Sequence, residues 1–345
     1  MTISPAQALD LGAFVLERVT ERPRRLRERE DLARAARTAH IEACGELPTG
    51  GTWLWTQHRA TWICGDAVVK VARGRYGEWS LRQDLSIRSR IEDDPVVQGW
   101  AHLVASTRWS GDVDNRYVVV EDRLPGSSLD SNTGDDSTLD RVTEQLYEVH
   151  SSTSHTVVAD GNRLMTWLCG PAITVSGLLE RWGHGGLAQR VRSWASRTAD
   201  ELRGRSTRVC LVHGDLWLGN VLGRNGDVTG LIDWDQAAPH DAALHDIVHF
   251  TFYPAAWERQ LDLGLIVREA LVTDLGEGAL GKVLRQRGFD QSCEDIGLEA
   301  RDALTWYWLR HTARMSAEPG HANNPRWVAR NVVAVASVLD KGEDQ

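Results

Sequence analysis

Residues 209–241 limit the possible fold and function of this chain more than any other stretch, because polar residues stand at fixed intervals between short apolar runs. His213-Gly214-Asp215 follows the run CLV, Asn220 comes five residues after Asp215, and Asp233 ends the run VTGLI. Short apolar runs bounded by turn residues such as GRNGD are typical of strands. An Asp and an Asn at this spacing can project from one tight loop into one pocket, which an Asp on the neighbouring strand can also reach.

These residue types suit phosphoryl transfer. The reaction needs a carboxylate that orients the attacking hydroxyl and accepts its proton, together with groups that hold Mg²⁺ against the triphosphate. Mg²⁺ takes hard oxygen ligands, few of them from the protein. The Asp–Asn–Asp set supplies groups of both kinds, so the segment predicts a phosphotransferase site.

The stretch LVHGDLWLGNVL, followed by GLIDWD, resembles the catalytic loop and metal-binding strand of the aminoglycoside phosphotransferase and choline kinase-like family, relatives of the protein kinases. The resemblance implies that Asp215 is the catalytic base and that Asn220 and Asp233 bind Mg²⁺. It implies that His213 braces the catalytic loop.

The same resemblance extends to neighbouring positions and to the fold. It implies that Leu222 and Ile232 line the base of the nucleotide pocket and that Asp246, in LHDIVHF, supports the catalytic loop. The implied fold is α+β and bilobal, with a small antiparallel-β N-lobe over residues 1–123 and a larger, mostly helical C-lobe over residues 124–345.

The N-terminal half is expected to bind the nucleotide, ATP or GTP. Lys70 in AVVKVA resembles the strand lysine that holds the α- and β-phosphates in the family, and it is one of only three lysines in the chain. Its acidic partner on the following helix is expected to be Glu78, with Asp84 as the rival. The run VVVEDRLPG resembles the hinge strand, so the backbone of residues 122–124 (Asp122, Arg123, Leu124) is expected to meet the purine.

Periodicity outlines the remaining elements. We expect helices over 6–46, 77–91, 137–152 and 172–204, the last interrupted at GHGG, and through most of the chain after residue 244. We also expect a small antiparallel sheet over 50–72 and a strand over 116–126. Residues 153–205 and the terminal helical regions are expected to build the acceptor site.

Composition excludes several classes of protein. The net charge is −9, and the arginine-rich stretch 22–34 is interleaved with acids, so we expect no binding to nucleic acid. The five cysteines form no C-x-x-C pair, which favours free thiols. No secretory signal or membrane span is evident, so we expect a cytoplasmic protein. We also expect a monomer or weak homodimer.

Two alternatives use the same residues differently. A metal-dependent phosphohydrolase could use His213, the pair His245-Asp246 and His249, since two histidines four residues apart on one helix have metal-ligand spacing. A nucleotide-binding regulator without activity would be expected to lack the base or a metal ligand.

The acceptor is expected to be a small hydroxylated antibiotic or related natural product. Choline, sugar and amino-acid kinases of the same fold remain alternatives. Acids in the C-terminal part would suit a cationic acceptor. Trp217 and Trp234, each next to a predicted site residue, could instead supply a stacking wall.

Overall fold

The computed structural model describes residues 27–97, 99–129, 136–273 and 278–339. These residues form two compact units: the first comprises the described residues up to Arg88 together with Ala105–Leu124, and the second comprises the described residues of 89–104 and those from Pro125 onwards. The division expected after residue 123 differs from this grouping in the segment 89–104. The first unit carries an antiparallel sheet and the second is mostly helical, as predicted.

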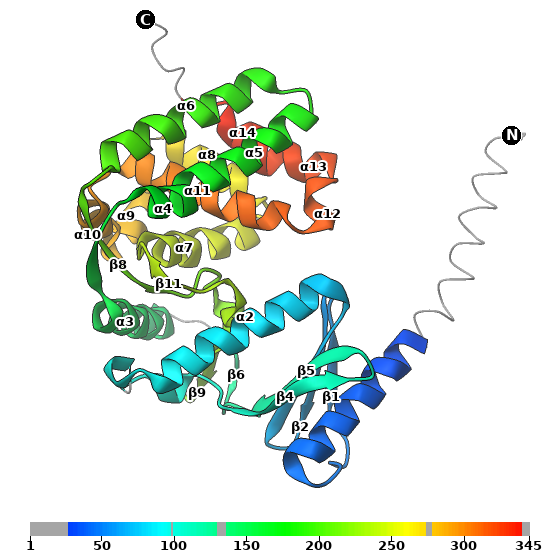
Figure 1. Cartoon of the computed structure of the whole chain (residues 1–345). Helices are drawn as coiled ribbons and strands as arrows, with labels where there is room; N and C mark the ends of the chain where they lie inside the picture. Colours follow the sequence, from blue (N-terminus) through cyan, green and yellow to red (C-terminus); the bar gives the residue numbers. More distant parts are fainter. Residues whose placement is uncertain (1–26, 98, 130–135, 274–277, 340–345) are drawn as a thin grey trace, which may run out of the picture. The chain divides into compact units, whose positions relative to one another are not determined.

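The first unit is built on a five-stranded antiparallel sheet with the strand order β1-β2-β3-β5-β4 (Figure 1). Its strands are β1 (Thr52–Trp55), β2 (Arg59–Cys64), β3 (Ala67–Ala72), β4 (Thr107–Val113) and β5 (Arg116–Asp122). The predicted sheet over 50–72 is confirmed, and its hairpin turns at Gly65, where φ is +57°. Strand β4 was not predicted.

Two helices cover the two faces of this sheet, which explains why β3 and β5 are buried over most of their length rather than at alternate residues. The helix over residues 27–44 packs Leu32 against Val69 and Val118 on one face. Helix α2 (Gly74–Asp93) packs Leu81 against Val119 on the other. The part of the predicted helix 6–46 before residue 27 lies outside the described residues.

The second unit contains two three-stranded sheets, with the orders β10-β9-β6 and β11-β8-β7 (Figure 1). Their strands are β6 (Ser127–Ser128), β7 (His155–Val158), β8 (Ser206–Val212), β9 (Val221–Arg224), β10 (Asp227–Leu231) and β11 (Ala238–Asp241). These strands place the loops that carry the predicted catalytic residues.

Helices make up most of the second unit. They are α3 (Asp136–Thr153), α4 (Gly161–Leu164), α5 (Gly170–Arg181), α6 (Gly185–Leu202), α7 (Leu244–Glu258), α8 (Leu263–Val272), α9 (Ala279–Gln286), α10 (Phe289–Ile296), α11 (Ala300–Ser316), α12 (Pro319–Ala322), α13 (Pro325–Val328) and α14 (Ala334–Ala336). The predicted helical region 172–204 is two helices, α5 and α6, that meet at residues 182–184.

Tryptophans fill the core of this helical unit. Trp306 and Trp308 are buried, and their indole N–H groups donate to the carbonyl oxygens of Trp167 and Asn331 at 2.9 and 2.8 Å. Burying an indole is favourable when its N–H finds an acceptor. Among the described residues, no helix combines the length and apolar character needed to cross a bilayer.

Candidate active site

The loop after β8 turns sharply at Gly214. Its φ is +78°, and a Cβ atom at this position would lie 2.2 Å from the carbonyl oxygen of Gln236. Only glycine fits both the backbone conformation and the space. The glycine of the His-Gly-Asp motif therefore lets the backbone pass close to Gln236 and sets the direction of Asp215.

Asp246 fixes the backbone of this loop from beneath. Its carboxylate accepts hydrogen bonds from the amides of His213 and Gly214, both at 2.7 Å, and from Nε2 of His150 at 3.0 Å. Burial alone would raise the pKa of Asp246, but these donors hold it down at about 2, so the carboxylate is charged at neutral pH. This is the position of a residue that supports the catalytic loop.

The imidazole of His213 connects the two parts of the motif. The ring is buried, lies 4.6 Å from the ring of Trp234 between centroids, and donates from Nε2 to the carbonyl oxygen of Ile232 at 2.9 Å. The amide of Ile232 in turn donates to the carbonyl oxygen of Asn220 at 3.0 Å. His213 thus has the contacts of a bracing residue.

Asp215 is the accessible carboxylate of the loop, with 32% of its side chain exposed. Its Oδ1 accepts from Nη2 of Arg314 at 3.0 Å, and Nη1 of Arg314 donates to the carbonyl oxygen of Gly214. Nδ2 of Asn220 lies 3.4 Å from Oδ2. Sequence reasoning missed Arg314, because it lies 99 residues away on α11 and arginine is the common cation of this chain.

An aromatic and histidine wall lies beside Asp215. Nε2 of His249 is 3.5 Å from Oδ1 of Asp215, and its Nδ1 is 2.8 Å from the hydroxyl of Tyr307. Burial lowers the pKa of His249 to about 4, so the ring is neutral at pH 7. Tyr253 packs against Trp217 with ring centroids 4.9 Å apart.

His245 and His249, two histidines of the phosphohydrolase alternative, contact neighbouring side chains. His245 is buried, with Nε2 3.2 Å from Oδ1 of Asp241, while His249 contacts Tyr307. Across the part of the chain that the structure describes, no three His, Cys, Asp or Glu side chains gather as a metal-binding group. The geometry therefore does not assemble the histidine-rich site that a hydrolase of this type would need.

Asn220 and Asp233 present the oxygen donors that suit Mg²⁺. Nδ2 of Asn220 donates to the backbone oxygen of Asp215 at 2.9 Å, and among the described residues its amide oxygen accepts no hydrogen bond, so it can ligate a cation. Asp233 has φ +64° and ψ +60°, a left-handed conformation that is uncommon outside glycine. Such backbone strain is concentrated at functional positions.

In the first unit, Lys70 is buried and its Nζ lies 2.8 Å from Oε1 of Glu121 on β5. The prediction that Glu78 pairs with Lys70 is wrong: Glu78 binds Arg82 at 2.9 Å on an exposed face of α2. Helical periodicity explains the error, because Asp84, not Glu78, lies on the buried face of α2.

Lys70 belongs to a set of four buried charges. Arg88 of α2 lies 3.1 Å from Oε2 of Glu121 and 2.9 Å from Oδ2 of Asp84, and it donates to the carbonyl oxygen of Ala105 at 2.6 Å. Lys70 and Arg88 thus balance Glu121 and Asp84 inside the unit, as buried charges require. Sequence reasoning missed Glu121 and Arg88, since both lie in stretches whose charges resembled solvent-facing ones.

The hinge segment is partly committed to internal hydrogen bonds. The amide of Asp122 donates to Ser106 and the amide of Arg123 to Asp66, at 2.9 and 2.8 Å. Among the described residues the amide of Leu124 has no acceptor. Leu222 on β9 and Ile232 after β10 are half-buried in the second unit.

Comparisons with known proteins bear on this arrangement. Residues 53–280 match the model of a family described as the phosphotransferase enzyme family. No curated protein sequence matches the chain.

Solved structures of aminoglycoside phosphotransferases share the fold. A thermostable mutant of APH(4)-Ia in its apo form has a TM-score of 0.55 and 15% identity, covering 90% of this chain and 100% of that one. The same enzyme in a ternary complex with AMP-PNP and hygromycin B has a TM-score of 0.55 and 15% identity, over 88% and 98% of the two chains. ADP-bound APH(2″)-Ib has a TM-score of 0.51 and 13% identity, over 84% and 93%. The predicted bilobal α+β fold is confirmed.

Proposed function

The chain belongs to the phosphotransferase enzyme family, and from that premise we propose that Asp215 directs the transfer of the γ-phosphate of ATP or GTP to a hydroxyl group of a small molecule. The observation that supports this proposal is the exposure and position of the Asp215 carboxylate. It is the accessible carboxylate of a loop that buried Asp246 holds through two backbone amides.

Asp215 orients the acceptor hydroxyl and takes its proton as the oxygen of that hydroxyl bonds to the γ-phosphorus. The bond between the γ-phosphorus and the bridging oxygen breaks, and the nucleoside diphosphate leaves. Arg314 fixes Oδ1, while Nδ2 of Asn220 lies 3.4 Å from the other oxygen. Positioning, more than basicity, is what phosphoryl transfer demands of such a carboxylate. The pair Arg314–Asp215 is therefore compatible with catalysis.

Asn220 and Asp233 are proposed to hold Mg²⁺. When bound, the ion would neutralise charge on the phosphates. His213 contributes indirectly, because its bond to Ile232 keeps the residue before Asp233 attached to the catalytic loop. Leu222 and Ile232 are proposed to lie under the purine.

Lys70 is proposed to bind the α- and β-phosphates, with Glu121 as its acidic partner. Of the three hinge residues, Leu124 is proposed to donate its amide to the purine, since the amides of Asp122 and Arg123 already have acceptors. Purine recognition through the backbone does not depend on side-chain identity.

The acceptor is proposed to be a hydroxylated antibiotic or related natural product. Trp217 and Tyr253 form an aromatic surface near Asp215. Tyr253 packs against His249, whose Nε2 lies 3.5 Å from Oδ1 of Asp215. Such a surface suits a ring-bearing molecule. The complex of APH(4)-Ia with hygromycin B supports this class of acceptor.

Two measurements test the proposal. Thermal unfolding is followed with ATP and with GTP, each with and without Mg²⁺, because a ligand that binds only the folded state raises its stability. A Mg²⁺-dependent rise with one nucleotide identifies the donor. A panel of hydroxylated antibiotics, with choline, sugars and amino acids, is then screened by mass spectrometry for the gain of one phosphoryl group.

Asp215→Ala completes the test. It should lower turnover by about two to four orders of magnitude and leave nucleotide binding intact. The matched control is Asp227→Ala, which removes an exposed carboxylate paired with Arg141. Turnover near the wild-type value in Asp215→Ala would refute its assignment.

A further inference from the structure

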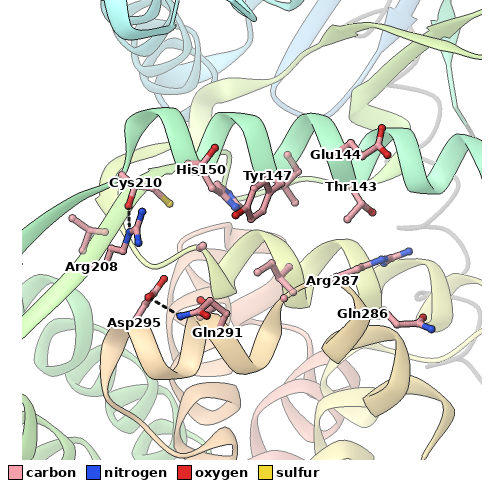
Figure 2. Close-up of a pocket in the computed structure, with 18 residues that line it drawn as sticks. Thr143, Glu144, Tyr147, His150, Arg208, Cys210, Gln286, Arg287, Gln291 and Asp295 are labelled. Carbon is pink, nitrogen blue, oxygen red and sulfur yellow. Dashed lines mark hydrogen bonds between the residues drawn. The ribbon is translucent and has the colours of Figure 1, made fainter.

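A pocket of about 620 Å³ lies within the second unit and shares no lining residue with the proposed catalytic loop or metal ligands. Helix α3, the middle of β8, the start of α7, the connection from α9 to α10 and α10 itself form its walls (Figure 2). Its volume falls in the range of small-molecule sites.

The interior of the pocket is apolar with a few polar groups. Leu146, Val209 and Ile247 line it and are buried. His150 also lines it and is buried, with Nε2 bound to Asp246. This composition is typical of ligand sites, where an apolar surface gives affinity and a few polar groups fix orientation.

One buried hydroxyl in the lining has no partner. Ser292 on α10 is 4% exposed, and among the described residues its Oγ makes no hydrogen bond. Leaving a buried donor unsatisfied costs roughly 1–3 kcal/mol. A polar atom of a bound molecule would remove that cost.

One end of the pocket carries a cation without a carboxylate partner. Nη1 of Arg287 donates to the backbone oxygen of Phe250 at 3.0 Å and to Oγ1 of Thr251 at 3.1 Å, and the guanidinium carbon lies 4.6 Å from the centroid of the Phe250 ring. Burial lowers the pKa of Arg287 to about 10, with Asp140 opposing the shift, so the group is charged at neutral pH. No described carboxylate lies within ion-pair distance of it.

The opposite end is more balanced in charge. Arg208 donates to Oγ of Ser154, and Asp295 accepts from Gln291 at 3.2 Å. Figure 2 shows Arg208 and Asp295 at one end and Arg287 at the other. Arg287 donates only to neutral oxygens, and the carboxylate of Glu144 lines the same end of the pocket without forming an ion pair with it (Figure 2).

We propose that this pocket binds a small organic anion, a carboxylate, phosphate or sulfonate group attached to an apolar body. The anionic group pairs with Arg287, the apolar body covers Leu146, Val209 and Ile247, and a polar atom bonds Ser292. Arginine is the residue best suited to this recognition, since its planar fork matches such oxyanions. The pocket lining contains none of Asp215, Asn220 and Asp233, so this proposal does not depend on the proposed transfer reaction.

The probe that tests this is anilinonaphthalene sulfonate, which joins one sulfonate to aromatic rings, and its neutral counterpart is phenylnaphthylamine. The sulfonate should bind the native protein saturably, with one dominant site and a fluorescence increase. Arg287→Met should weaken its binding about tenfold or more, as expected for loss of a charge-assisted contact. Binding of the neutral compound should change little.

A second variant and a control make the test independent of Arg287. Ser292→Leu fills the pocket and should weaken both compounds, whereas Arg268→Met, an exposed change on α8, should affect neither. Circular dichroism and thermal unfolding confirm that each variant is folded. If Arg287→Met fails to fold, Ser292→Leu alone decides.

Two results would overturn the proposal: unchanged sulfonate affinity in the folded pocket variants, or displacement of the probe by Mg²⁺ and ATP, which would place it in the nucleotide site. Because the assay needs neither nucleotide nor acceptor, a failure of the proposed kinase activity would leave its result unaffected.

Discussion

Nη2 of Arg314 on α11 lies 3.0 Å from Oδ1 of Asp215, so the proposed base is held in an ion pair by a helix far along the chain. The side chain of Arg314 is 15% exposed, which leaves the pair less screened than one on the surface. The same guanidinium donates to the backbone of Gly214. Arg314 therefore orients both the carboxylate and the loop that carries it.

Arg314→Met should lower kcat about tenfold or more while leaving the KM for nucleotide close to the wild-type value, because orientation matters most in the transition state. Steady-state kinetics with the identified acceptor measure both constants. Arg326→Met, an exposed change on α13, serves as the control. An unchanged kcat in Arg314→Met would contradict the role in orientation.

Asp233→Asn should abolish the Mg²⁺ dependence of nucleotide binding, or weaken it by at least tenfold, since the amide keeps the shape but loses the charge that attracts a divalent cation. Asn is the informative replacement because, like Asp, it tolerates the left-handed backbone found at φ +64°. Thermal-shift titrations with nucleotide at rising Mg²⁺ give the result.

The backbone strain at Asp233 can be measured separately. Asp233→Gly should be more stable than Asp233→Ala by about 1 kcal/mol, because only glycine is free of the left-handed penalty.

For the Mg²⁺ prediction, equal Mg²⁺ dependence of nucleotide binding in the wild type and Asp233→Asn would contradict the metal-binding role of this residue.

Glu121→Ala should lower the free energy of unfolding by about 3 kcal/mol or more, because it removes a carboxylate that faces two buried cations, Lys70 and Arg88. Urea unfolding measures the loss. Glu78→Ala should change stability by no more than about 0.5 kcal/mol, since its partner Arg82 is exposed. A loss of stability in Glu78→Ala as large as that in Glu121→Ala would contradict the assignment of Glu121, rather than Glu78, as the partner of Lys70.

Acid should destabilise the protein between about pH 6.5 and pH 4 through His249. Burial lowers the pKa of His249 to about 4, so over this range the unfolded chain binds a proton that the folded protein does not. Stability is thus highest above pH 6.5 and falls as pH drops, by on the order of 3 kcal/mol from this group.

The matched variants are His249→Gln and His184→Gln. Urea unfolding at pH 7 and pH 4.5 should show a smaller loss of stability in His249→Gln than in the wild type, and the wild-type loss in His184→Gln. His245 and His311 are buried with lowered pKa values as well, so part of the decline should persist. An identical decline in all three proteins would exclude His249 as a source.

The loop that carries Asp215 and Asn220 could be predicted from the sequence because its signal is local. Residues 213–220 form one short loop. Their residue types and spacing can therefore be recognised in the sequence whatever the arrangement of the surrounding helices. The sheet over 50–72 was predictable for a similar reason, since adjacent strands joined by a tight turn form contacts close in sequence.

Features that depend on distant pairing were missed. Arg314 reaches Asp215 from α11, and no local pattern distinguishes it from the other arginines. Strand β4 was overlooked because its residues are mostly half-buried and alternate poorly. Glu78 was preferred for Lys70 on residue type alone, whereas the orientation of α2 and the pairing of β3 with β5 bring Glu121 to the lysine.

The buried set of Lys70, Asp84, Arg88 and Glu121 also limits how this protein can evolve. Exchanging any one member for an apolar residue leaves the charges unbalanced in the interior, so each single step is expected to be harmful even where a fully apolar replacement of the set would fold well. Lineages of this protein should therefore either keep all four residues or have replaced several together, which would leave correlated changes at these positions among its relatives.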